Sequence, residues 1–266
     1  MMDKEPEVLD VCMIAKQAGM ILKEGLGKRH DVHMKGVQDP VTEIDKRSED
    51  FIIKILNNEY PTHSILTEET GLHEGKTSDH KWYIDPLDGT MNYAHGIPFF
   101  CVSMAYADKK GLSLGVIYDP VRDECFYAER GKGAWLNGSP ISCSSQTDLP
   151  EALMSSGFNM GIVKLGETNF RLFKYFMENS AGVRRMGSAA LALAYAACGR
   201  LDAVWELHLS PWDVAAGFVI CKEAGAIVTD LKGYEDYFND PYEFVAANKF
   251  LHPIILHQIQ TVGYKE

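Results

Sequence analysis

The chain has 266 residues, of which 46% are hydrophobic and 24% charged, and this is enough to form a large hydrophobic core. Its 26 Lys and Arg residues against 37 Asp and Glu residues give a net charge of −11 at pH 7, which argues against a nucleic-acid-binding surface. No apolar run approaches the roughly 20 residues of a membrane-spanning helix, and the acidic N-terminus does not resemble a signal peptide. We therefore expect a cytoplasmic protein that binds neither membrane nor nucleic acid.

The six cysteines lie far apart in the sequence and form no CxxC or Cys/His pattern with the spacing of a zinc site. Most of them sit in apolar stretches. We expect them to be buried free thiols, which is the usual state of cysteine in a reducing compartment.

Two amphipathic helices are predicted near the N-terminus. The first spans about residues 6–25, where apolar residues recur at helical spacing and glycines end the run. Residues 35–45 follow as a predicted loop and lead into the second helix. Asp45, at the start of this helix, has two interpretations that the pattern leaves open. It suits the positive end of the helix dipole, or it faces the turn that contains Asp85 and helps to orient a proton donor there.

A short strand is predicted over residues 63–71, with Glu68 and Glu69 at its end, and the polar residues 72–81 are a predicted surface loop. Adjacent acids beside a loop are usually solvated. The end of a strand is also where α/β folds place functional groups, so Glu68 is a candidate for a cation site.

The most informative stretch is Trp82–Tyr93, in which an apolar run leads directly to Asp85 and Asp88. Pro86 has no N–H and a fixed φ, so we predict that it stops the strand and holds both aspartates in a turn. Two carboxylates with the carbonyl of Leu87 between them would suit a hard divalent cation such as Mg²⁺. A D-x-x-D spacing by itself, however, is most often a solvated turn.

The remainder of the chain is predicted to alternate between strands and helices. An antiparallel meander is expected over residues 99–107, 112–118 and 124–129, and Asn137-Gly138 signals a further hairpin. There follow a strand at 152–156, a helix at 168–178, a strand at 183–186, a helix at 188–198, a strand at 201–205, a helix from Pro211, strands at 226–229 and 243–246, and a final helix near Pro253.

Two of these helices begin with residues that suit a functional site. Gly187 and Ser188 open the helix at 188–198, where free backbone N–H groups bind phosphate, although the close packing of an alanine-rich helix explains the same residues. Asp213 falls in the first turn of the helix from Pro211, where the helix dipole favours an anion whatever its function.

Together, these segments resemble a known family. The sequences W-Y-I-D-P-L-D-G-T-M-N at residues 82–92 and W-D-V-A-A-G at residues 212–217 are similar to the two signature regions of the inositol monophosphatase family. The sequences D-P-V-T-E-I-D at residues 39–45 and L-T-E-E at residues 66–69 match its pattern in the same order, and residues 187–189 also look like a family segment. The resemblance covers essentially the whole chain.

This resemblance implies an α/β fold, namely the layered α/β/α/β/α sandwich of the inositol monophosphatase and fructose bisphosphatase type. It implies a single catalytic domain of two packed lobes, approximately residues 1–141 and 142–266. It also implies a Mg²⁺-dependent, lithium-sensitive phosphatase with about two or three ions per site, dimeric in many members. Lys35 lies in a loop that looks shorter than in the animal enzymes.

The same resemblance assigns roles to residues of this chain. The metal ligands would be Glu68, Asp85, the Leu87 carbonyl, Asp88 and Asp213. The residues that position or deprotonate the attacking water would be Thr90, Asp45 and Glu68. The substrate would be bound by Asp88, Gly89, Thr90, Gly187, Ser188, Ala189, Glu206 and Asp213.

The chemistry that these residues allow is the hydrolysis of a phosphate monoester by a metal-activated water. Catalysis would depend on positioning and electrostatics, since the sequence offers no Ser/His or Cys/His nucleophile pattern. The resemblance implies inositol 1-phosphate as the substrate, since Glu206 matches the position that contacts a substrate hydroxyl in the inositol enzymes, and its carboxylate would favour a neutral polyol over a second phosphate. Fructose 1,6-bisphosphate, a 3′-phosphoadenosine nucleotide, histidinol phosphate and a partner-binding role in a transcription complex stay open as alternatives.

Overall fold

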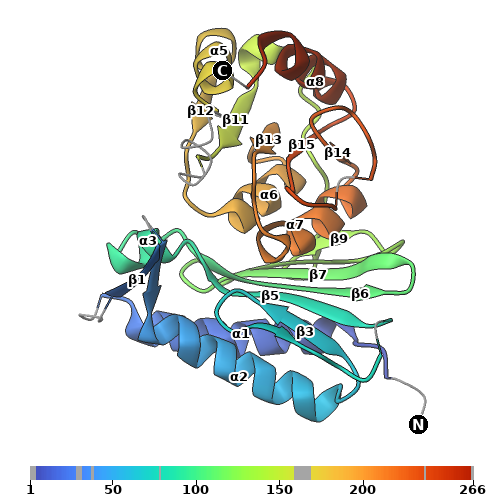
Figure 1. Cartoon of the computed structure of the whole chain (residues 1–266). Coiled ribbons are helices and arrows are strands. Elements are labelled where there is room, and N and C mark those ends of the chain that lie inside the picture. Colours follow the sequence, from blue (N-terminus) through green and yellow to red (C-terminus); the bar gives the residue numbers. More distant parts are fainter. Residues whose placement is uncertain are drawn as a thin grey trace.

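A computed structural model describes residues 4–27, 32–36, 39–77, 79–158, 169–236 and 238–264 of the chain, with the backbone alone over residues 32–42. The described elements stack in alternating layers of helix and sheet, in the order α/β/α/β/α (Figure 1). This arrangement confirms the predicted fold class. The side chain of Lys35 lies outside the described part of the structure.

The first helical layer consists of α1 (Val8–Gly25) and α2 (Glu43–Glu59), which cover one face of an eight-stranded sheet (Figure 1). Its strands are β3 (Ser64–Thr67), β4 (Gly71–His73), β5 (Lys81–Asp88), β6 (Cys101–Asp108), β7 (Gly111–Asp119), β8 (Glu124–Glu129), β9 (Ala134–Leu136) and β10 (Ser139–Ile141). Their lateral order is β10-β9-β8-β7-β6-β5-β3-β4. Each strand from β5 to β10 pairs antiparallel with the next, so the predicted meander is confirmed, whereas β3 runs parallel to β5.

The middle helices, α6 (Ala189–Ala197) and α7 (Pro211–Glu223), separate this sheet from a five-stranded sheet (Figure 1). The strands of the second sheet, in lateral order, are β12 (Gly182–Arg184), β11 (Leu153–Ser156), β13 (Ala203–Glu206), β15 (Phe244–Ala247) and β14 (Ile227–Thr229). The outer helices are α5 (Phe170–Asn179) and α8 (Leu251–Val262), and the short ones are α3 (Thr90–Ala94) and the 3₁₀ helix η1 (Leu149–Glu151).

Glycine and alanine allow the middle helices to fit between the two sheets. A Cβ atom on Gly217 of α7 would lie 2.5 Å from the Leu193 side chain of α6, and one on Gly115 of β7 would lie 2.5 Å from the Ala216 carbonyl oxygen. Glycine at these positions therefore lets α7 approach both α6 and β7 closely. The alanine-rich α6 is buried along almost its whole length, as the close-packing interpretation predicts.

Two predicted loops contain strands. The segment at 35–45 includes most of an antiparallel hairpin formed by β1 (Val32–Gly36) and β2 (Asp39–Thr42), and α2 begins directly after it. Pro40 is tolerated in β2 because the edge of a two-stranded ribbon has positions that need no backbone N–H. The polar segment at 72–81 likewise begins within β4, an edge strand that is antiparallel to β3.

The cysteines carry no disulfide, as predicted. Buried thiols are Cys12, Cys101, Cys125 and Cys221, whereas Cys143 and Cys198 are half-buried. Within the described part of the chain, every helix is too short or too polar to span a bilayer.

Candidate active site

The two aspartates of the stretch Trp82–Tyr93 lie at the end of β5, where the strand contains a bulge. Asp85 pairs with Ser103 of β6 and Asp88 pairs with Cys101, so β5 has one residue more than its partner between these pairs. The prediction that Pro86 stops the strand and places both aspartates in a turn was therefore wrong. A bulge absorbs the extra residue and leaves Pro86, which has no N–H, outside the regular ladder.

Both aspartates of the bulge are buried, with exposed fractions of 2% for Asp85 and 8% for Asp88. The Leu87 N–H donates to Oδ1 of Asp85 at 2.9 Å, which fixes this carboxylate over the bulge. Burial raises the pKa of Asp85 well above its ordinary value. Three neighbouring carboxylates raise this pKa further: Glu68, Asp88 and Asp213.

Glu68 and Asp213, the two neighbours of Asp85 that lie outside β5, come from different elements of the fold. Glu68 directly follows β3, and its backbone N–H donates to the Ile84 carbonyl of β5 at 3.3 Å. Asp213 lies in the first turn of α7, where its Oδ2 accepts the Ser210 N–H at 2.8 Å in a capping box. The pKa of Asp213 is raised well above its ordinary value by burial and then by the charge of Asp88. The fold thus brings four acidic side chains from two strand ends and one helix start within electrostatic range of each other.

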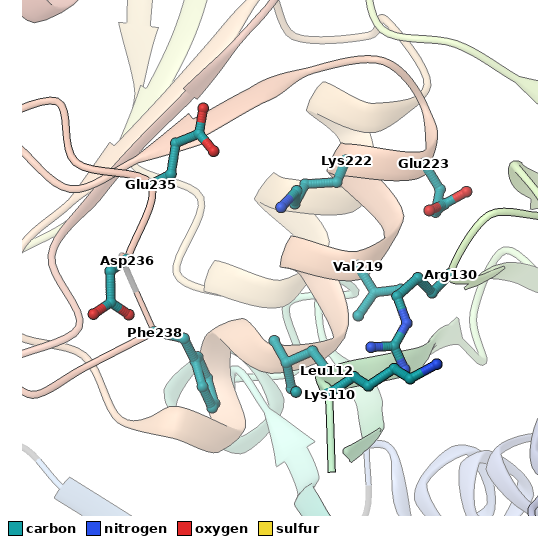
Figure 2. A pocket seen from close by; sticks show the side chains of 10 residues that line it. Lys110, Leu112, Arg130, Val219, Lys222, Glu223, Glu235, Asp236 and Phe238 are labelled. Carbon is teal, nitrogen blue, oxygen red and sulfur yellow. The ribbon is translucent and has the colours of Figure 1, made fainter. Parts of the chain in front are cut away.

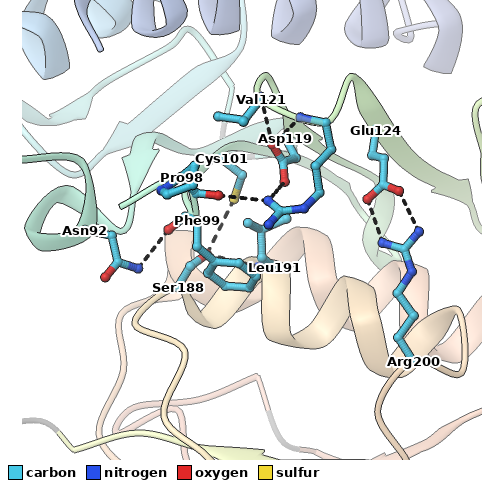
Figure 3. Close-up of polar contacts among 11 residues, drawn as sticks. Asn92, Pro98, Phe99, Cys101, Asp119, Val121, Glu124, Ser188, Leu191 and Arg200 are labelled. Carbon is cyan, nitrogen blue, oxygen red and sulfur yellow. Dashed lines mark hydrogen bonds and ion pairs between the residues drawn. The ribbon is translucent and has the colours of Figure 1, made fainter. Parts of the chain in front are cut away.

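Asp88 is held by the N-terminus of α6. Its Oδ2 accepts hydrogen bonds from the Ser188 hydroxyl at 2.5 Å and from the Ala190 N–H at 2.8 Å. Burial raises the pKa of Asp88, while these donors lower it. The thiol of Cys101 lies beside the same group, 3.8 Å from the Ser188 hydroxyl (Figure 3). The positive end of α6, predicted to face a substrate phosphate, therefore faces a protein carboxylate in this structure.

Thr90 and Asp45 are in contact. The Thr90 hydroxyl lies 3.1 Å from Oδ1 of Asp45 and 3.0 Å from the Leu87 carbonyl oxygen, and it has one proton to donate to either. Asp45 is 1% exposed at the start of α2. Asp45 lies in the first turn of α2, as the helix-dipole interpretation requires, and it also contacts Thr90, which follows the two aspartates of β5.

Gly89, the N-cap of α3, has a φ of +95°. A Cβ atom there would lie 3.0 Å from the Phe99 carbonyl oxygen and 3.2 Å from that of Gly187, so only glycine fits without displacement of the backbone. The two halves of the chain therefore meet at this residue.

Asn92 joins the same two halves, and the sequence reasoning did not single it out. Its amide nitrogen donates to the Phe99 carbonyl at 2.8 Å and to the Met186 carbonyl at 2.9 Å. The first of these bonds is visible in Figure 3. On the other side, Arg122 donates to the Pro98 carbonyl at 2.8 Å, so the segment before β6 is held at two points. The only indication of this role in the sequence is that Asn92 is a polar residue two positions after Thr90.

A cavity of ≈ 230 Å³ opens beside these carboxylates. It is lined by Asp88, Gly157, Phe158, Arg185, Gly187, Ser188, Ala189, Glu206, Leu209 and Asp213. Six of the predicted substrate residues are in this set, whereas Gly89 and Thr90 are not. Of the other lining residues, Arg185 lies two positions before Gly187, whereas Gly157, Phe158 and Leu209 come from segments that no local sequence pattern marked.

Glu206, at the end of β13, is a buried acid within this cavity. It is 7% exposed, and burial raises its pKa to about 8, although the Gly157 backbone and the charge of Arg185 lower it. A Cβ atom on Gly157 would lie 2.5 Å from Oε2 of Glu206, so glycine is needed for this close approach. The carboxyl group is consequently positioned to exchange hydrogen bonds with a ligand hydroxyl.

A larger cavity, of ≈ 420 Å³, lies beside the other end of α7, between Lys110, Lys222 and Phe238 (Figure 2). Two of its charged residues, Arg130 and Glu223, already have partners. Arg130 binds Asp108 at 2.5 Å, and Glu223 accepts the N–H groups of Gly131 and Gly133 at 2.8 and 2.9 Å. The acidic cluster is absent from its lining, so we place the candidate site in the smaller cavity.

The acidic cluster has the donor chemistry of a hard divalent cation, because all its ligands would be carboxylate or carbonyl oxygens. Mutual repulsion of buried carboxylates, visible in the raised pKa values of Asp85 and Asp213, is relieved by such a cation. Among the described residues, however, no three His, Cys, Asp or Glu side chains already converge as a ligand group. One oxygen each of Asp85, Asp88 and Asp213 is engaged by a backbone N–H instead.

A bulged strand end with buried aspartates, between two helix N-termini in a five-layer fold, defines a class of metal-dependent phosphatases. The model of the inositol monophosphatase family matches residues 5–264, and the chain belongs to this family. The predicted family and the predicted type of enzyme are thereby confirmed.

Individual relatives agree with this membership. The chain is 45% identical over 240 residues to inositol monophosphatase 3 of Solanum lycopersicum, covering 86% of this chain and 88% of the relative. It is 41% identical over 248 residues to Nus factor SuhB of Pasteurella multocida, covering 92% of each. The solved structure of the inositol monophosphatase from Anabaena is similar, with a TM-score of 0.87 at 35% identity, covering 97% of this chain and 96% of that one.

Proposed function

We propose that the protein is a Mg²⁺-dependent phosphomonoesterase that hydrolyses inositol 1-phosphate to inositol and phosphate. The observation that carries this proposal is the group of Glu68, Asp85, Asp88 and Asp213, which share one electrostatic environment beside the Glu206 cavity. The family and the similarity to a relative named inositol monophosphatase 3 support it.

In this proposal, two or three Mg²⁺ ions would be held by Glu68, Asp85, the Leu87 carbonyl, Asp88 and Asp213. Bound there, the ions would supply positive charge to neutralise the phosphoryl oxygens and to activate a water. Such charge compensation is what an acidic chain needs to accept a phosphorylated substrate.

Thr90 and Asp45 would orient the attacking water. When the Thr90 hydroxyl donates its proton to Oδ1 of Asp45, its oxygen lone pairs are free to accept a hydrogen bond from that water. Glu68 would accept the proton that the water loses. Gly89 and Thr90 would offer backbone N–H groups to the phosphate, and the Gly187–Ala189 segment, which lines the Glu206 cavity, would bind another part of the substrate.

Glu206 would select the alcohol part of the substrate. A buried carboxyl group whose pKa is raised to about 8 can exchange hydrogen bonds with a neutral polyol, but while it is protonated it does not supply the repulsion of a second phosphate that the sequence predicted. Phe158 and Leu209 add apolar surface to the same cavity, which suits the C–H face of a cyclitol ring. These features favour inositol 1-phosphate over fructose 1,6-bisphosphate and over a 3′-phosphoadenosine nucleotide.

A turnover panel tests the substrate directly. Phosphate release at millimolar Mg²⁺ would be compared for inositol 1-phosphate, fructose 1,6-bisphosphate, a 3′-phosphoadenosine nucleotide and histidinol phosphate. We expect the highest kcat/KM for inositol 1-phosphate, its loss on chelation with EDTA, and inhibition by lithium. A higher kcat/KM for a bisphosphate or a nucleotide would overturn the substrate assignment.

The second candidate function is a partner-binding role in a transcription complex, which the 41% identity to a Nus factor SuhB favours. The net charge of −11 argues that such a partner would be a protein rather than a nucleic acid. A pull-down with purified RNA polymerase tests this role. Retention that Asp88→Asn leaves unchanged would support it beside the enzymatic one, and no retention would exclude RNA polymerase as the partner.

We also propose that the protein acts as a cytoplasmic homodimer. Size-exclusion chromatography with light scattering would measure the mass, for which we expect twice the 29.7 kDa of one chain. A mass of one chain at micromolar concentration would contradict the dimer.

A further inference from the structure

The inner face of α2 carries three polar side chains that are almost completely buried. Asp45 is 1% exposed, Ser48 is 0% exposed and Glu49 is 1% exposed. Their spacing of three and four residues places them on one face of the helix. The helix packs against β5 (Figure 1). Asp45 contacts Thr90, as described above, whereas Ser48 and Glu49 have no role in the proposed chemistry.

Glu49 holds the turn between β3 and β4. Its Oε2 accepts the backbone N–H of Glu69 at 3.0 Å, and its Oε1 accepts the Thr70 hydroxyl proton at 2.6 Å. Thr70 also lies 2.6 Å from Nε2 of His73 and 3.1 Å from the Thr67 hydroxyl. One buried carboxylate therefore connects α2 to both strands that flank the turn.

This turn begins with Glu68, the acidic residue from β3 in the candidate site. The backbone on one side of the Glu68 side chain is fixed by the bond from its N–H to the Ile84 carbonyl, at 3.3 Å. The backbone on the other side is fixed by the bond from Glu69 to Glu49. These two bonds fix the backbone at Glu68 and at Glu69, and thereby the direction in which the Glu68 side chain points from the backbone.

Ser48 acts on the neighbouring part of the site in the same manner. Its hydroxyl donates to the Pro86 carbonyl at 3.0 Å, within the bulge that separates Asp85 from Asp88. The helix therefore contacts the bulge through Ser48, the start of α3 through Asp45 and the Glu68 turn through Glu49.

A buried carboxylate is costly to desolvate, and an apolar side chain would fill the same space without that cost. Two hydrogen bonds to an ionised acceptor compensate for it and restrict the geometry more than apolar contact does. A carboxylate at this position is thus explained by the geometry that it imposes on the turn.

We propose that Glu49 is a positioning residue for the metal site: it orients Glu68 toward the shared cations through the β3–β4 turn. The inference rests on the proposed function, since it takes Glu68 as a metal ligand. It adds a residue that touches neither the substrate nor the ions.

The experiment is a titration of Mn²⁺, used as a spectroscopic substitute for Mg²⁺, into the full-length protein with detection of free Mn²⁺ by electron paramagnetic resonance. We expect Glu49→Ala to weaken Mn²⁺ binding about tenfold or more. Glu49→Gln keeps an oxygen that can accept the Glu69 N–H, so it should recover most of the affinity. Thr70→Val removes the other partner at an exposed position and should weaken binding by about threefold.

Two controls on the same helix separate positioning from stability and charge. Ile52→Ala creates a cavity in the core beneath α2 and should lower the thermal midpoint without changing the Mn²⁺ affinity of the folded protein. Asp50→Ala removes an exposed carboxylate next to Glu49 and should change neither quantity. If Glu49→Ala does not fold, Thr70→Val decides the question.

The outcomes distinguish this inference from the proposed function. Wild-type Mn²⁺ affinity in Glu49→Ala, or in Thr70→Val where the former does not fold, would overturn the positioning role while the proposed function stands. Wild-type Mn²⁺ affinity in Glu68→Gln would instead show that Glu68 is not a metal ligand. It would overturn both the proposed role of Glu68 and the positioning role of Glu49.

Discussion

The Oδ2 atom of Asp88 lies 2.5 Å from the hydroxyl oxygen of Ser188, a residue 100 positions further along the chain. This contact joins the end of β5 in the large sheet to the N-terminus of α6 in the middle layer. A carboxylate of the first half of the chain is therefore oriented by a helix of the second half. The candidate site forms only when the two halves are packed together.

Replacement of Asp88 by Asn tests the role of its charge. We expect phosphate release at millimolar Mg²⁺ to fall at least about a hundredfold, because the metal site loses a negative ligand. The fold should persist, since an amide oxygen can still accept the bonds from Ser188 and Ala190. Asp50→Asn, an exposed change on α2, is the control and should retain normal turnover. Near-native turnover in the Asp88 variant would count against the assignment.

Thr90→Ala tests the orientation of the attacking water. Removal of the hydroxyl that contacts Asp45 should lower kcat by about 10²-fold while Mn²⁺ affinity stays unchanged. Thr90→Ser keeps a hydroxyl and should restore most of the rate. An unchanged kcat in the alanine variant would remove Thr90 from the mechanism.

Glu206 predicts a pH-dependent contribution to stability. Burial raises its pKa in the folded protein from the ordinary value of 4.5 to about 8. The folded state then holds a proton that the unfolded state has lost between these values, so this contribution is fully present below pH 4.5 and falls as the pH rises toward 8. Its slope should be at most about 1.4 kcal/mol per pH unit.

Urea unfolding of wild type and Glu206→Gln between pH 5 and 8 measures this effect, because glutamine does not titrate. The free energy of unfolding of wild type relative to the variant should decrease steadily as the pH rises. A difference that stays constant over this range would contradict a buried, protonated Glu206.

Asn92→Ala tests the link between the two halves of the chain. The change leaves the carbonyls of Phe99 and Met186 without this donor, so we expect a loss of about 1–3 kcal/mol in the free energy of unfolding. The matched control is Asn179→Ala, since the amide of Asn179 also donates to a carbonyl, that of Tyr175, but at an exposed position. Its loss should stay within about 0.5 kcal/mol. Equal losses in the two variants would show that Asn92 does not link the halves.

Hydrophobic spacing and turn residues were sufficient to predict the longer helices and the meander, whereas the short α3 and η1 were not predicted. The bulge in β5 could not be predicted, since it depends on how Asp85 and Asp88 align with β6. Pro86 has the same local properties in a turn and in a bulge.

In the candidate site, the acidic residues were visible because they lie in recognisable motifs at strand ends and helix starts. Gly157 and Phe158 were not singled out as site residues, because only long-range packing brings them to the cavity of Glu206. Glu49 was overlooked for a different reason. An acid in an amphipathic helix normally faces solvent, and nothing local indicates that this one is buried.

The central claim, that the four carboxylates bind shared divalent cations, is tested most directly by anomalous diffraction from crystals soaked in Mn²⁺. We predict anomalous peaks within coordination distance of Asp85, Asp88 and Asp213, with Glu68 on at least one of the ions. Peaks elsewhere on the protein, or none beside these carboxylates at millimolar Mn²⁺, would contradict the account.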